Sequence, residues 1–298
     1  MGFSYHHYLG ESIYRSKAGK QKVLDLYDQK LAELKIEHQS KKVSTLFGET
    51  HVLILGPKDA PPLFLLHPRN VINPLALSLF KPLLKKYRIY APDLIGHPGK
   101  SSEKRLRPKS DKYGKWLTEV MDKLKVSEAN FVGASIGGLA LLQLAGFSPD
   151  RILKAILVNP PGIVKVPRST LIFRLWLPYF LYSFIPTQKN LLKAIGPHFT
   201  EEPTQEWLEA LGIIYKNVKI GLEAPSTVSK SDLQSFKAET LLFASEKDTL
   251  YSIEELTKRA KDIIPNLSTI EILMKAKHMP SEKDFKLINE RIISFLKS

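Results

Sequence analysis

The chain of 298 residues contains no cysteine. Disulfide bonds, cysteine-ligated zinc, iron–sulfur clusters and a cysteine nucleophile are therefore excluded. The N-terminal residues lack the basic start and apolar centre of a secretory signal. No uncharged apolar stretch reaches the 18 residues that a membrane span requires, and the nearest, Leu171 to Ile185, is interrupted by Arg174 and Pro178. We therefore expect a cytoplasmic protein without a membrane span.

Nucleotide and metal motifs are also missing. Gly137 and Gly138 are adjacent, but no G-x-G-x-x-G or G-x-x-x-x-G-K-[ST] pattern surrounds them. His6 and His7 have no further ligand residues at metal-binding spacing, so we do not expect them to hold a metal ion. Nothing in the sequence calls for a metal or an organic cofactor, and we expect none.

Acidic residues are fewer than basic ones. Lysine and arginine number 44 against 30 aspartates and glutamates, which gives a net charge of +14. Between Lys81 and Lys115 there are eleven basic and three acidic residues, so that stretch carries +8 of the total. Such an excess can attract nucleic acid, anionic lipid or an acidic substrate. Because no nucleic-acid motif accompanies the charge, we interpret it as a solvated surface and expect no nucleic-acid partner.

Apolar runs and periodic patterns alternate along most of the chain. We expect an amphipathic helix over 20–34, then two strands over 43–47 and 51–55 that form a hairpin joined at Gly48-Glu49. Further strands are expected over 63–66, 88–91, 129–132, 154–158, 240–244 and 269–273. Helices are expected over 74–86, 111–125, 139–146, 252–263 and 284–297. This order predicts an α/β fold whose mostly parallel sheet is covered by helices on both faces.

A long stretch rich in aromatics and prolines, from about residue 159 to 236, interrupts this alternation. We interpret it as a helical insertion packed over the sheet. The expected organisation is therefore an N-terminal helical extension over 1–42, an α/β core over 43–158 and 237–298, and a helical cap over 159–236.

The most specific motif is Gly133-Ala134-Ser135-Ile136-Gly137. It follows a predicted strand and opens a predicted helix, which is the setting of a G-x-S-x-G nucleophile elbow. The serine of such an elbow sits on a sharp, strained turn, and the glycines let neighbouring chains pass closely. The helix that follows directs its unpaired N–H groups and positive dipole end toward the serine. Ser135 is thus the candidate nucleophile.

Two partners follow Ser135 in the required chain order. Asp248 comes just after the predicted strand 240–244, and His278 just after the predicted strand 269–273. Open α/β sheets place their sites at the carboxyl ends of strands. We expect Asp248 to hold the imidazole of His278 in one tautomer, and His278 to take the proton from Ser135 and return it to the leaving group.

Four sequence blocks resemble the α/β-hydrolase fold superfamily, and in particular its esterase-like serine hydrolases with a helical cap. They are residues 61–68, similar to the family's strand followed by His-Gly; residues 91–101, similar to its Asp-x-x-Gly-x-Gly-x-Ser turn; the elbow; and His278 with the C-terminal helix. The second block is more often structural, so Asp93, Gly96 and Ser101 receive no catalytic role. His67 is likewise assigned to structure, and His51, His97 and His198 have no recognisable partner spacing.

The family's glycine after the first histidine is replaced here by Pro68, which has no N–H to donate. The resemblance then implies that the backbone N–H groups of Arg69 and Ile136 form the oxyanion hole. Pro98 is a second departure, because it adds one residue to the Asp-x-x-Gly-x-Gly turn.

The expected activity is hydrolysis of a small, partly apolar carboxylic ester through an acyl-enzyme on Ser135. Several alternatives remain open on the same fold: C–C, lactone or amide hydrolysis, cofactor-free perhydrolysis, or a ligand-binding homologue without catalysis. A further alternative is a lipase-like enzyme in peripheral contact with membranes, suggested by the stretch Leu171 to Ile185 and the basic excess. Arg69 is expected to favour acidic substrates.

Overall fold

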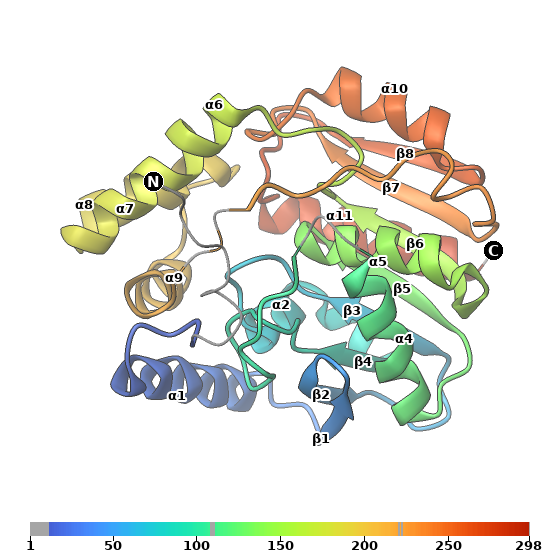
Figure 1. Cartoon of the computed structure of the whole chain (residues 1–298), viewed down its shortest axis with the longest axis horizontal. Coiled ribbons are helices and arrows are strands. Elements are labelled where there is room, and N and C mark those ends of the chain that lie inside the picture. The colour runs from blue at the N-terminus through green and yellow to red at the C-terminus, as the bar shows by residue number, and fades with distance from the viewer. Residues whose placement is uncertain (1–11, 108–110, 220, 222, 298) are drawn as a thin grey trace, which may run out of the picture.

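A computed structural model describes residues 12–107, 111–219, 221 and 223–297 (Figure 1). His6 and His7 lie outside the described residues. The strands are β1 (His38–Thr45), β2 (Gly48–Leu55), β3 (Pro62–Leu66), β4 (Arg88–Pro92), β5 (Ala129–Ala134), β6 (Ile152–Val158), β7 (Glu239–Ser245) and β8 (Leu267–Leu273).

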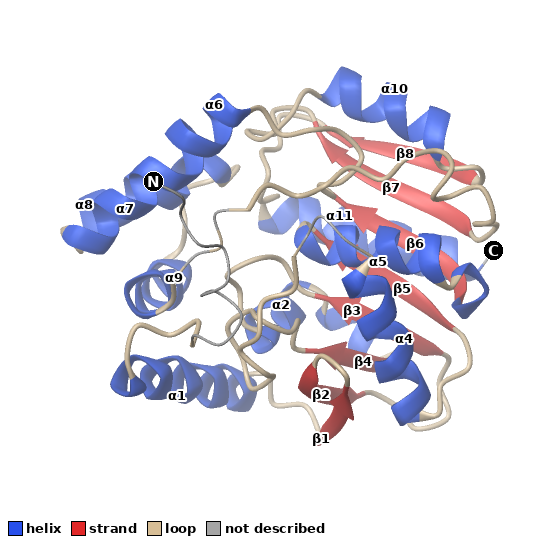
Figure 2. Cartoon of the chain, viewed as in Figure 1, coloured by secondary structure: helices blue, strands red, loops and turns tan. Residues whose placement is uncertain are grey.

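These strands form one eight-stranded sheet in the order β1-β2-β4-β3-β5-β6-β7-β8 (Figure 2). β1 pairs antiparallel with β2, and β2 antiparallel with β4, whereas every pair from β4 to β8 is parallel. The prediction of a mostly parallel sheet is confirmed. All six residues of β5 are buried, as expected for a parallel strand covered on both faces.

Helices cover the two faces of the sheet. They are α1 (Lys17–Glu33), α2 (Asn73–Leu79), α3 (Lys81–Leu84), α4 (Lys112–Leu124), α5 (Ile136–Phe147), α10 (Ile253–Ile263) and α11 (Glu282–Lys297), with a short 3-10 turn η2 (Pro149–Arg151). One apolar core lies between the sheet and α4, α5 and α10. A second core lies on the other face, where α1, α2, α3 and α11 pack.

Two local predictions need correction. The hairpin turns at Leu46-Phe47, because Thr45 pairs with Gly48 and Gly48 already belongs to β2 with a φ of +124°. The helix expected over 74–86 is divided at Phe80, whose φ of −115° ends α2. Pro82 then occupies the first turn of α3, where a missing N–H costs nothing.

Between β6 and β7 the chain forms a set of helices that lie away from the sheet (Figure 1). They are α6 (Arg168–Thr170), the π-helical turn η3 (Leu171–Trp176), α7 (Leu177–Phe184), α8 (Gln188–Ile195), the 3-10 turn η4 (Gly196–His198) and α9 (Gln205–Asn217).

The segment before the sheet is fastened to this insertion. Lys30 of α1 forms an ion pair of 2.9 Å with Glu206 of α9, and Tyr14 forms a β-bridge with Val218. In Figure 1 α1 lies below α9, and the two helices are in contact. β1 begins at His38, so the sheet starts five residues before the core boundary that we placed at residue 43.

Candidate active site

Ser135 occupies the sharp turn between β5 and α5. Its φ of 48° and ψ of −121° place the residue in a strained conformation that a non-glycine residue rarely adopts. Its own N–H donates to the carbonyl of Val158 at 2.9 Å, which anchors the turn to the end of β6. The side chain is partly exposed, although its neighbours in β5 are buried. The strained turn therefore presents the hydroxyl at the carboxyl edge of the sheet.

The glycines on either side of Ser135 make this turn possible. A Cβ atom on Gly133 would lie 2.6 Å from the carbonyl oxygen of Gly137. A Cβ atom on Gly137 would lie 2.2 Å from the carbonyl oxygen of Leu66 in β3. Real Cβ atoms do not come this close to other atoms, so any larger residue would push the helix away from the sheet.

The three residues that the sequence proposed as partners lie together. The Oγ of Ser135 is 3.0 Å from Nε2 of His278, and Nδ1 of His278 is 2.8 Å from Oδ2 of Asp248. The carboxylate can only accept, so Nδ1 carries the proton and Nε2 is free to accept the proton of the serine hydroxyl. Asp248 is held in place because its Oδ1 accepts the N–H of Leu250 at 2.8 Å. Its side chain is 1% exposed, so solvent hardly competes for the contact with His278.

Asn159 supports this arrangement and was not anticipated from the sequence. It follows β6 directly and has a φ of 46°, which asparagine tolerates better than most residues. Its side-chain amide donates to Oγ of Ser245 at 2.8 Å and to the carbonyl of His278 at 2.9 Å. Its Oδ1 accepts the N–H of Ser245 at 2.8 Å. An asparagine after a strand was the only signal, and it does not say which loops the side chain will join.

The loop after β3 faces the same site. The imidazole of His67 is buried, its Nδ1 donates to the carbonyl of Pro68 at 2.9 Å, and its Nε2 accepts the N–H of Leu94 at 2.8 Å. These two bonds require the neutral ring, and burial lowers the pKa of His67. Within the described residues, no hydrogen-bond acceptor is assigned to the backbone N–H of Arg69 or of Ile136. Both residues line the pocket that holds Ser135.

The pocket above Ser135 is mostly apolar. The insertion supplies much of its wall, including Leu171, Leu175, Trp176, Tyr179 and Leu211. Among the residues that the structure describes, the pocket is lined by one arginine, Arg69, and one acidic residue, Glu223. The guanidinium of Arg69 donates to the carbonyl of Gly221 at 3.2 Å. Burial lowers the pKa of Arg69, and the nearby tyrosines and Glu223 act in the opposite direction.

Known proteins share this architecture. A family model for the α/β hydrolase fold matches residues 65–192. Carboxylesterase YbfK of Bacillus subtilis is 26% identical over 285 residues, which cover 91% of this chain and 92% of that protein. The crystal structure of naproxen esterase from Bacillus subtilis matches with a TM-score of 0.81 and 23% identity, over 95% of this chain and 99% of that one. The chain therefore has the α/β-hydrolase fold.

In this α/β hydrolase a second histidine lies beside His278. His198 lines the pocket, its Nδ1 accepts from Oγ1 of Thr249 at 2.6 Å, and its Nε2 donates to the carbonyl of Arg174 at 3.1 Å. Burial, with a smaller contribution from His278, lowers the pKa of His198 to about 4. The ring is therefore neutral at pH 7. The role of His198 could not be read from the sequence, because its contacts come from separate segments of the chain.

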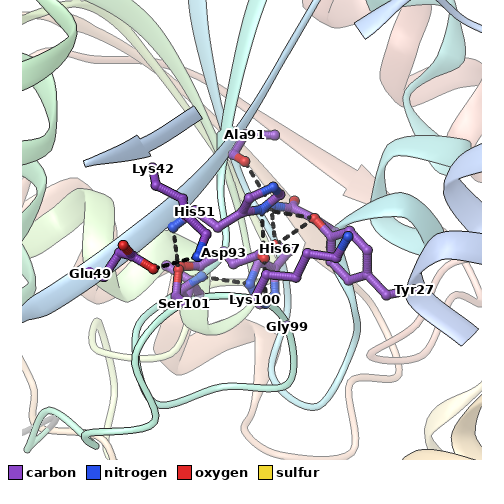
Figure 3. Close-up of polar contacts among 12 residues, drawn as sticks. Tyr27, Lys42, Glu49, His51, His67, Ala91, Asp93, Gly99, Lys100 and Ser101 are labelled. Carbon is purple, nitrogen blue, oxygen red and sulfur yellow. Dashed lines mark hydrogen bonds and ion pairs between the residues drawn. The ribbon is translucent and has the colours of Figure 1, made fainter. Parts of the chain in front are cut away.

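The hydrolase's Asp93 network lies next to His67 (Figure 3), and Asp93 and its hydrogen-bond partners do not line the pocket. Asp93 is fully buried and accepts hydrogen bonds from Tyr27, His51, Asn73 and the backbone N–H of Lys100, at 2.8–3.0 Å. Ser101 donates to the Asp93 carbonyl at 2.8 Å. With its hydrogen-bonding capacity filled in this way, the carboxylate ties α1, β2 and α2 to the loop after β4. Its position agrees with the structural role that the sequence assigned to this block.

Proposed function

We propose that this protein is a serine carboxylesterase that uses Ser135 as nucleophile, His278 as general base and acid, and Asp248 as the residue that orients the histidine. The hydrogen-bonded series from Ser135 through His278 to Asp248 carries this proposal. Carboxylesterases that align with nine tenths of the chain support an ester-acting hydrolase.

In the proposed reaction, the proton of Ser135 moves to Nε2 of His278 as Oγ attacks the ester carbonyl carbon. The imidazolium is stabilised by Asp248, which needs no solvent reorganisation because it is already in place. His278 then gives its proton to the departing alcohol, and the acyl group stays on Ser135. Water, deprotonated by His278, releases the acid and restores the serine.

The negative charge that develops on the carbonyl oxygen needs donors. We assign this role to the backbone N–H groups of Ile136 and Arg69. Ile136 begins α5, so its N–H is unpaired within the helix and lies at the positive end of the helix dipole. Each donor of such a pair typically raises kcat by a factor of about 10²–10³. Pro68 does not disable this loop in our proposal, since its carbonyl accepts from His67 and the donor comes from the next residue.

The substrate proposed is an ester with an apolar acyl or alcohol part. Aliphatic and aromatic side chains dominate the pocket, and a site of this kind selects ligands by shape and burial of apolar surface. We propose that residues 159–236 act as the cap of this pocket, because η3, α7 and α9 supply its outer wall.

A fluorophosphonate probe tests the proposal, because it labels only a serine that is activated as a nucleophile. We expect labelling at Ser135 in the wild-type protein, located by mass spectrometry, and none in Ser135→Ala. A panel of p-nitrophenyl esters then gives kcat/KM as a function of acyl length. Folded wild-type protein that neither reacts with the probe nor cleaves any ester would overturn the assignment.

A further inference from the structure

Exposed apolar side chains gather on one part of the insertion. Seven of the thirteen large apolar side chains that are exposed in the described part of the chain lie between residues 172 and 185. Phe184 is 82% exposed, Phe173 65% and Leu177 56%. We call the whole group the outer face; it consists of Ile172, Phe173, Leu177, Phe180, Leu181, Phe184 and Ile185. Scattered exposed apolar residues need no explanation, but a contiguous group marks an interaction surface.

The outer face follows from the helical period. Phe173, Leu177, Phe180 and Phe184 recur every three or four positions and form one stripe along η3 and α7. A second stripe, Leu171, Leu175, Tyr179 and Tyr182, has the same period and packs toward the protein. Leu171, Leu175 and Tyr179 line the pocket above Ser135. The same helical run therefore has one side in the candidate active site and the other in solvent, and Figure 1 shows it at the outer limit of the molecule.

The charged residues of the segment that carries the outer face all have one sign. From Arg151 to Thr200 the sequence contains seven lysines and arginines and no aspartate or glutamate. Among these, Lys165, Arg168, Arg174, Lys189 and Lys193 are exposed and lie within or next to the helices of the outer face. An apolar stripe bordered within its own segment by basic residues alone has the composition of a helix that lies in a membrane interface and attracts anionic lipid. A second copy of the chain would bring an equally basic border against this one, which opposes self-association.

We infer that the outer face docks on the surface of an anionic lipid bilayer, with α7 lying in the interface plane and its aromatic side chains in the headgroup region. No helix in the described residues has the length and hydropathy to cross a bilayer. In this orientation Leu175 and Trp176, which line the pocket, lie on the side of the helical run that faces away from the lipid. The inference does not depend on the esterase activity proposed above, because it concerns binding alone.

Co-sedimentation with vesicles tests the docking. The protein is used as the Ser135→Ala variant, so that any hydrolysis cannot alter the lipid. We expect it to pellet with vesicles that contain phosphatidylglycerol at about 20 mM salt, to be released at about 500 mM salt, and to stay in solution with pure phosphatidylcholine.

Two pairs of variants separate the apolar and the electrostatic contributions. Phe173→Ser with Phe184→Ser should lower the partition coefficient at least ten-fold, since both side chains enter the interface. Leu46→Ser with Met274→Ser is the matched control, because these side chains are 88% and 66% exposed elsewhere on the surface, and it should change binding less than two-fold. Arg168→Glu with Lys189→Glu should also lower binding about ten-fold. Its control is Lys58→Glu with Lys86→Glu. This pair makes the same change of charge just before β3 and β4, at the amino ends of these strands and far in the fold from the outer face.

The inference fails if phosphatidylglycerol vesicles do not retain the protein at low salt. It also fails if the Leu46 and Met274 control loses binding as strongly as the Phe173 and Phe184 pair. Light scattering gives a third decisive outcome: a wild-type dimer that the Phe173 and Phe184 pair converts to monomer would assign the outer face to a second copy of the chain. Folding of every variant is checked by circular dichroism.

Discussion

The side-chain amide of Asn159 donates a hydrogen bond of 2.9 Å to the backbone carbonyl of His278. The same side chain also holds Ser245 through two further bonds of 2.8 Å. The ends of β6 and β7 and the loop of His278 are thus fastened at one point. Asn159 does not line the pocket, so we regard it as a positioning residue.

Replacing Asn159 by glycine should separate positioning from folding. Glycine accepts the positive φ of this residue without strain, so Asn159→Gly removes the three hydrogen bonds and little else. We expect kcat on a p-nitrophenyl ester to fall about 10–100-fold with little change in KM, because a small displacement of His278 misaligns the proton transfer. A variant that melts lower but keeps the wild-type kcat would show that the residue serves stability alone.

Because α5 lies very close to β3, we expect alanine substitutions at two glycines to differ strongly in their effect on the free energy of unfolding. Gly137→Ala places a Cβ atom 2.2 Å from the carbonyl of Leu66, whereas Gly196→Ala meets nothing within 4 Å. We expect the first change to lower the free energy of unfolding by about 2–4 kcal/mol, and the second to change it by about 0.5 kcal/mol or less. Urea unfolding followed by circular dichroism measures both. Equal stability of the two variants would contradict the packing described for the elbow.

Arg69 should influence which esters are accepted. Arg69→Met keeps the backbone N–H and most of the side-chain volume but removes the positive charge. We expect kcat/KM for an ester carrying a carboxylate to fall about ten-fold relative to a neutral ester of the same length, since the guanidinium lines the pocket. An unchanged ratio of the two kcat/KM values would remove the side chain from substrate selection.

His198 should make the protein less stable in acid. Its pKa is about 4 in the folded protein and near the usual 6.5 when unfolded. Between these values the unfolded chain binds the proton and the folded chain does not, so the contribution to stability is present above pH 6.5 and is lost as the pH falls toward 4. The loss is at most about 3 kcal/mol. His198→Gln should therefore flatten the decline of urea midpoints between pH 7 and pH 4.5. Part of the decline will remain in this variant, because burial also lowers the pKa values of His67 and His97. A variant with the wild-type slope would show that His198 titrates normally.

Much of the fold followed from local patterns. Apart from the edge strand β8, the parallel strands are short apolar runs that are largely buried. Each parallel strand could be located from the sequence within about two residues. The meeting of Ser135, Asp248 and His278 could be expected too, because their motifs follow strand ends and the carboxyl ends of parallel strands share one edge. Both predictions depend on the hydrophobic period and on the order of strands and motifs, which can be read from the sequence.

What could not be anticipated depends on contacts between distant segments. The break at Phe80 needed knowledge of how α2 and α3 pack, since the apolar period runs on across it. Asn159 gains its role from residues 86 and 119 positions away in the chain, and His198 is held by Thr249 and Arg174, which are 51 and 24 positions away. The two stripes of η3 and α7 were visible as one apolar stretch, but only the fold separates the buried stripe from the exposed one.

The contact of α1 with α9 has a consequence for synthesis. α1 and the segment before it are made early, yet Glu206, the partner of Lys30 in α1, lies 176 positions after it, and Val218 lies about as far after its partner Tyr14. At about 5–20 residues per second, a ribosome needs roughly 10–40 seconds to deliver them. During that interval the apolar side of α1, with Val23 and Tyr27, lacks part of its final cover. We therefore expect a nascent chain of this protein to expose that apolar side until the insertion has emerged.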